Sequence, residues 1–102
     1  MTERTHLTQP DEGLRRARLD DDVRAGLHAI AKQLSTIRPD DPMSDGNRTA
    51  RALTYATERY GFRTPAADEL DRALLAAMPR IIGRTTRDAY AIVLRTAAGS
   101  PR

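Results

Sequence analysis

The chain has 102 residues, of which 39% are hydrophobic and 4% aromatic, and its net charge is +3 at pH 7. That length encloses one modest core, so we expect a single domain. The absence of cysteine excludes a disulfide framework and thiolate metal sites. No apolar run approaches the ~18 residues of a membrane-spanning helix and no apolar signal segment is visible, so we expect a soluble cytoplasmic protein that does not enter a membrane.

The charge is distributed unevenly along the chain. Residues 1–43 carry a net charge of −1, whereas residues 44–102 carry +4. All basic residues except Lys32 are arginines, and alanine is abundant. We interpret this composition as coding bias from a GC-rich bacterial or phage genome, which concerns origin and not role. A mildly basic C-terminal half permits contact with nucleic acid without specifying it.

Residues 1–19 are polar and charged, and we expect them to form a flexible tail or a short helical lead-in. Leu14 and Leu19 favour the lead-in. Between these leucines lies a small basic cluster: Arg15, Arg16 and Arg18. The simplest interpretation of the cluster is a solvated segment whose charge is balanced by the acids that follow.

The N-terminal helix is predicted over residues 20–38. Its apolar residues are spaced by four, three, four and three positions, which is one face of an α-helix: Val23, Leu27, Ile30, Leu34 and Ile37. The run Asp20, Asp21 and Asp22 precedes them. We expect one aspartate to cap the helix and the others to lie near the positive end of its dipole, which is a simpler explanation than a metal site. Gly26 either weakens the helix or marks a close crossing.

Residues 39–47 are predicted to form a loop. Pro39 disfavours helical geometry at the residue before it and so ends the first helix. The loop holds two prolines and three aspartates. It does not match a calcium-binding loop, because the position that requires glutamate, counted from Asp41, is Ala52. It therefore connects the N-terminal helix to a C-terminal group of three helices, residues 48–98.

The first helix of that group is predicted from residue 47 or 48 to Tyr60, with Gly61 as its stop. A thin apolar stripe marks its inner face: Ala50, Leu53, Ala56 or Thr57, and Tyr60. Expected outside the stripe are Ala52, Tyr55, Arg48 and Arg51. Phe62 is expected to fill the corner before the next helix.

The last two helices are predicted on either side of Pro79, which interrupts the apolar pattern. The first starts at Pro65 with Thr64 as its N-cap. It should bury Leu70, Leu74, Leu75, Ala77 and Met78. A connector over residues 80–84 should keep Ile81 and Ile82 in the core. The final helix, residues 86–97, should bury Ala89, Tyr90, Val93, Leu94 and Ala97 and leave Arg87 and Arg95 outside. Four helices with short connections indicate an all-α bundle.

Residues 53–74 have the spacing of a helix-turn-helix unit, with Gly61 in the turn and Ala67 and Leu70 facing inward. The helix that would read DNA, however, has acids in its first two turns: Asp68, Glu69 and Asp71. These carboxylates would face phosphate, and base-reading arginines or amides are missing there. The pattern therefore argues against reading of the major groove.

A second route to nucleic acid is a patch of arginines. The candidates are Arg80, Arg84, Arg87 and Arg95, with Arg48, Arg51, Arg59 and Arg63 as further members. If these side chains converge, they would bind phosphate without reading base sequence. The alternative is that they are separate surface residues, since no aromatic residue alternates with them to stack on bases.

No catalytic pattern is visible. His6 and His28 are the only histidines, and the sequence has neither a nucleophile triad nor a glycine-rich phosphate loop. We therefore expect a protein that acts without enzymatic activity, cofactor or metal. The preferred function is a small interaction or regulatory protein that binds another protein, or itself as a homodimer, through a helix face that includes Leu75 and Ile92. The alternative is a small DNA-associated regulator.

Overall fold

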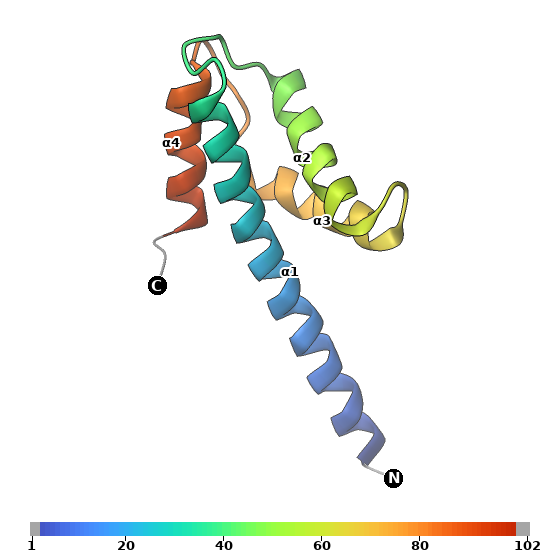
Figure 1. Cartoon of the computed structure of the whole chain (residues 1–102). Coiled ribbons are helices and arrows are strands. Elements are labelled where there is room, and N and C mark those ends of the chain that lie inside the picture. Colours follow the sequence, from blue (N-terminus) through green and yellow to red (C-terminus); the bar gives the residue numbers. More distant parts are fainter. Residues whose placement is uncertain (1–2, 100–102) are drawn as a thin grey trace.

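The computed structural model describes the backbone of residues 3–99 and the side chains of residues 12–99. It contains four helices: α1 (Glu3–Thr36), α2 (Asp45–Tyr60), α3 (Pro65–Ala77) and α4 (Arg87–Ala98). Over the described residues there is no strand, which confirms the predicted all-α fold. α4 runs antiparallel beside the C-terminal half of α1, and α2 packs on α3 (Figure 1). The N-terminal half of α1 projects from the bundle (Figure 1).

α1 begins earlier than the sequence indicates. Residues 3–19, for which we expected a tail or lead-in, are helical as far as the backbone is described. The run of aspartates lies in the middle of the helix, so the capping role and the start near residue 20 are wrong. Acids favour a first turn only weakly, and the leucines, arginines and alanine before them are good helix formers that continue the helix. The helix ends at Thr36, two residues before the predicted end.

The core is built mainly from the predicted face of α1 and from α3. Leu27, Ile30 and Leu34 are almost completely buried, together with Leu70, Leu74 and Met78. Ile37 is an exception and is 53% exposed, because the helix has already ended before it. The regular spacing of aliphatic residues therefore predicted the main contacts of the core correctly.

The inner face of α2 includes the predicted Ala56 but not the predicted Ala50 and Leu53. Ala52 and Ala56 are completely buried, whereas Leu53 is 51% exposed. The reason is a close crossing at Gly26, where an added Cβ would lie 2.9 Å from side-chain atoms of both Tyr55 and Leu74. Helices that approach so closely accommodate alanine rather than leucine between them. Gly26 thus has the second of its two predicted roles.

The C-terminal part confirms the predicted N-cap but not every buried position. The Thr64 hydroxyl accepts a hydrogen bond from the Ala67 N–H at 3.1 Å. In α4, Tyr90 and Leu94 are buried as predicted. Three predicted core residues of α4 are instead exposed, with Ala91 buried in their place: Ala89, Val93 and Ala97.

The two connectors also differ from prediction. Phe62 does not fill the corner between helices; it is 72% exposed and lies under the guanidinium of Arg63. Ile81 is partly buried, but Ile82 is 92% exposed because the connector turns outward before the positive φ of Gly83. None of the described helices combines the length and the apolar character that crossing a membrane requires.

Candidate functional site

Arg48 is buried, although the sequence places it on a polar flank. Its Nε–H donates to the carbonyl oxygen of Met78 at 3.1 Å, and its Nη2 donates to that of Leu75 at 2.8 Å. The last carbonyls of a helix lack intrahelical donors. For Leu75 the residue four positions on is Pro79, which has no N–H to donate. Arg48 therefore supplies the missing donors at the end of α3 and is not available to a ligand.

Arg87 has an equivalent role at the end of α1. It is 8% exposed, and its Nε–H donates to the carbonyl oxygen of Ile37 at 3.0 Å. Main-chain hydrogen bonds next to it, from the Arg87 N–H to the Asp41 oxygen and from the Asp88 N–H to the Pro39 oxygen, attach the loop after α1 to the start of α4. The expectation that Arg87 lies outside is therefore wrong.

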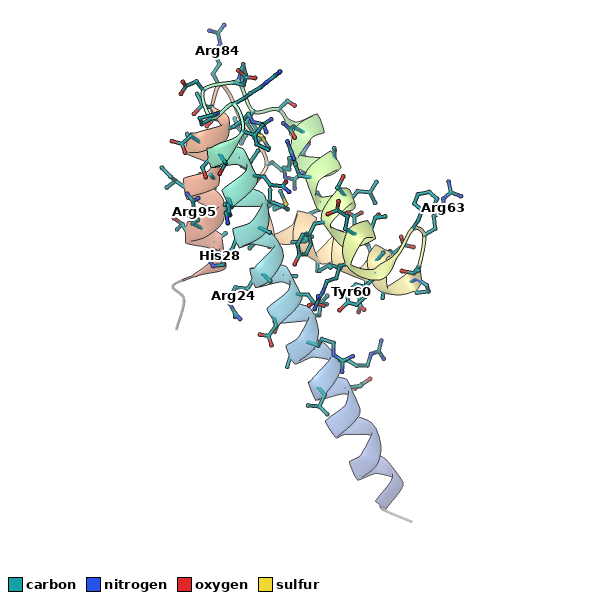
Figure 2. The ribbon with its side chains drawn as sticks, in the orientation of Figure 1. Arg24, His28, Tyr60, Arg63, Arg84 and Arg95 are labelled. Atoms are coloured by element: carbon teal, nitrogen blue, oxygen red, sulfur yellow. The ribbon has the colours of Figure 1, made fainter. Side chains whose placement is uncertain are left out.

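Four of the remaining six candidate arginines lie in different places, and Arg59 and Arg63 belong to contacts described separately. Arg51 donates from Nη1 to the Gln33 side chain at 3.0 Å, and Arg95 donates from Nη2 to Ser35 Oγ at 3.0 Å, so both contact α1. Arg80 and Arg84 are exposed in the connector before α4. Arg84 points away from the bundle at the end opposite the projecting half of α1, whereas Arg95 lies beside α1 (Figure 2). The structure thus divides these six of the eight candidate arginines among helix ends, interhelical contacts and one connector.

The helix-turn-helix spacing is realised only in part. Ala67 and Leu70 are buried, as that spacing requires. Asp68 and Glu69 are exposed on the first two turns of α3, where a recognition helix would meet DNA. Two of the three predicted acids therefore lie on the surface, whereas the third, Asp71, is half-buried with its Oδ1 enclosed.

A buried carboxylate joins α1 to the end of α2. The side chain of Asp22 is 7% exposed; it accepts hydrogen bonds from the Tyr60 hydroxyl and from Nη2 of Arg59, the latter at 3.2 Å. Figure 2 shows Tyr60 reaching from α2 toward α1. The hydrogen bond to Asp22 raises the pKa of Tyr60 above its usual value. Sequence reasoning missed this cluster because 38 residues separate its two main partners.

A recess lies beside this cluster, between α1 and the corner that joins α2 to α3. Both charged and apolar side chains line it: Arg15, Arg18, Leu19, Asp22, Tyr60, Pro65, Ala66 and Glu69. Two arginines and two carboxylates are among these residues, so the recess has no single sign of charge. It shows where the projecting half of α1 leaves the bundle.

A second groove, lined mainly by aliphatic residues, lies where α1, α3 and α4 meet, and we call it the alanine groove. Its lining consists of Leu19, Val23 and Leu27 from α1, Ala73, Ala76 and Ala77 from α3, Ala97 and Ala98 from α4, and the charged Asp20 and Arg24. The predicted docking residues lie elsewhere: Leu75 packs partly against the core, and Ile92 is exposed on α4. The groove was missed because its alanines come from helices that are distant in sequence.

Within the described part of the chain, no three histidine, cysteine or acidic side chains lie close enough together to hold a metal ion. The chain matches no protein-family model, and it is similar neither to a curated protein nor to a solved structure at a significant level. Its function must therefore be argued from the surfaces described above.

Proposed function

We propose that this chain is a small cytoplasmic interaction or regulatory protein that acts without catalysis, through contacts between its helix faces and another protein chain. The alanine groove supports the proposal, because eight of the ten residues that line it are apolar. Covering such side chains is favourable at about 25 cal/mol per Å² of apolar surface. Because five of these lining residues are alanines with small side chains, a partner helix can also approach the groove closely.

The projecting half of α1 supports the same proposal. Residues 12–18 are exposed on all sides, and Leu14 is 65% exposed. A helix without neighbours is marginal in water, and Gly13 weakens this one further by about 1 kcal/mol relative to alanine. A partner that covers this segment would supply the stabilisation that the bundle does not.

The alternative, a DNA-associated regulator, has less support. Arg80 and Arg84 are exposed and would be available to phosphate. Arg48 and Arg87, however, already donate to main-chain carbonyls. Micromolar binding of random duplex DNA that weakens steeply with salt, measured by fluorescence anisotropy, would favour this alternative over a protein partner.

Site-specific photo-crosslinking tests the proposed function. A photoreactive residue at Ala76, on the groove, should yield protein adducts in cells of the source organism, and mass spectrometry would identify the attached chain. The matched control is the same residue at Thr54, an exposed position of α2 that does not line the groove. Equal yields of adduct at the two positions would contradict a protein-binding role for the groove.

A further inference from the structure

Four charged residues follow one another along α1 at intervals of four positions: Glu12, Arg16, Asp20 and Arg24. Residues four apart on an α-helix are neighbours offset by only about 40° around its axis, so these side chains form a row that winds gradually around the helix. Their charges alternate in sign, and all four side chains are exposed. We call this set the charged row.

The charged row connects the projecting half of α1 to the alanine groove. Asp20 and Arg24 line the groove, whereas Glu12 and Arg16 lie on the segment that extends beyond the bundle. Among the described side chains, no ion pair joins two members of the row, and Arg24 pairs instead with Asp21 at 3.2 Å. The alternation is therefore not used for salt bridges within the helix.

The order of charges makes the row complementary to itself in a two-fold symmetric antiparallel pair, but not in a parallel pair in register. When two copies of α1 lie antiparallel and are centred near residue 18, Glu12 lies opposite Arg24 and Arg16 lies opposite Asp20. A two-fold axis repeats both pairs, which gives four opposite-charge contacts across one interface. A parallel pair in register would place every charge against its own kind. Such complementarity favours the antiparallel orientation over the parallel one.

We propose that the partner of this surface is a second copy of the chain, paired antiparallel along the charged row. The beginning of the row in each copy, near Glu12, lies at the alanine groove of the other copy. This inference rests on the proposed function, since it names the partner of the same surface. The exposed segment of residues 12–18 is then covered by the partner's bundle, which explains how a helix that projects alone is stabilised.

Charge reversal in the full-length chain tests the pairing. Arg16→Glu places two acids opposite each other, and Asp20→Arg places two arginines opposite each other. By sedimentation equilibrium at low salt, each variant alone should dissociate at least about tenfold more readily than the unaltered dimer, which corresponds to ~1.4 kcal/mol. An equimolar mixture of the two variants should form a heterodimer, because every opposed pair then has opposite charges. The double variant Arg16→Glu/Asp20→Arg should dimerise again.

The matched control is Arg84→Glu, an equal change of charge at the opposite end of the bundle (Figure 2). It should leave the dissociation constant of the dimer unchanged. Circular dichroism should show that the bundle is folded to the same helix content in every variant. A monomeric unaltered protein, or single variants that dimerise as well as the unaltered chain, would overturn the pairing. If adducts to a different protein still form at position 76, the proposed function survives and only self-association is lost.

Discussion

The C-terminal half of α1 packs against the other three helices, whereas residues 12–18 of its N-terminal half are exposed (Figure 1). Both halves carry charged residues, but they use them differently. In the packed C-terminal half, Asp22 accepts hydrogen bonds from Tyr60 and Arg59, and Arg87 donates to the carbonyl oxygen of Ile37 directly after α1. In residues 12–18 of the projecting half, the charged side chains face solvent.

This difference shows that the number of arginines in a sequence is a poor guide to the surface available for binding. A guanidinium has five N–H donors, so a buried arginine can complete a helix end that has no other donor. The arginines that were the strongest candidates for phosphate binding include two that stabilise the fold. The exposed residues near the N-terminus, which we interpreted as a solvated segment, are the ones left available to a partner.

The largest effect is expected when α2 loses its buried Arg48. Arg48→Met removes the donors to Leu75 and Met78 and leaves their carbonyls unpaired, which should lower the free energy of unfolding by roughly 2–4 kcal/mol. The measurement is urea denaturation. Arg51→Met, three residues along the same helix, removes more exposed hydrogen bonds and should change stability by less than about 1 kcal/mol. Equal effects of the two variants would contradict the role given to Arg48.

The close crossing at Gly26 should give the next largest effect. Gly26→Ala places a Cβ 2.9 Å from the Tyr55 and Leu74 side chains, so it should destabilise the fold by about 1–2 kcal/mol despite alanine's higher helix propensity. Gly46→Ala in α2 meets only the Ser44 hydroxyl, at 3.9 Å, and should stabilise the fold by up to about 1 kcal/mol. Thermal denaturation compares the two, and a stabilising Gly26→Ala would show that the helices are not closely packed there.

The Asp22 cluster should contribute less. Tyr60→Phe removes one hydrogen bond to a carboxylate and should destabilise the fold by about 1 kcal/mol. Because the folded pKa of Tyr60 is raised, its contribution is present below the usual tyrosine pKa of 10.0 and is lost as the pH rises above it. Denaturation between pH 8 and 11 should therefore show a smaller loss of stability for Tyr60→Phe than for the unaltered chain. Parallel pH profiles would contradict the coupling.

The smallest change in stability is expected for a substitution of Asp71 in α3. Unlike the substitutions of Arg48, Gly26 and Tyr60, this one should stabilise the fold. Its Oδ1 is buried without a hydrogen-bond partner, and burial raises the pKa of this carboxyl above its usual value. The ionised form is therefore disfavoured in the folded state, and wild-type stability should rise as the pH falls through the raised pKa toward 3.8. Asp71→Ala should stabilise the fold by up to about 1 kcal/mol at pH 7, and this gain should shrink in acid. A loss of stability at pH 7 would indicate that Asp71 makes a useful contact.

Local signals in the sequence predicted much of the fold. The spacing of Leu27, Ile30 and Leu34 identified the inner face of α1, and Thr64 with Pro65 identified the start of α3. These signals depend on neighbouring residues only. The start of α1 was missed because a run of aspartates resembles a cap even in the middle of a helix.

The candidate site was predicted much less well, because it depends on which helices meet. Pro79 showed that a carbonyl in α3 would lack its donor, but no local pattern assigns Arg48 to it across 27 residues. The alanine groove is formed by residues of three helices. Alanine occurs on both buried and exposed helix faces, so its spacing alone did not identify the groove. The charged row was within reach of sequence reasoning, since its spacing is regular, but its exposure had to come from the structure.

Intermolecular distances between spin labels on α1 test the central claim most directly. The chain has no native cysteine, so Ala25→Cys and Lys32→Cys each place one label per copy at an exposed position. Antiparallel pairing centred near residue 18 predicts separations along the helix axis of about 21 Å and about 42 Å, because the helix rises 1.5 Å per residue. A distance that increases in this way from Ala25 to Lys32 would establish the pairing. Equal distances at the two positions, or no coupling between copies, would contradict it.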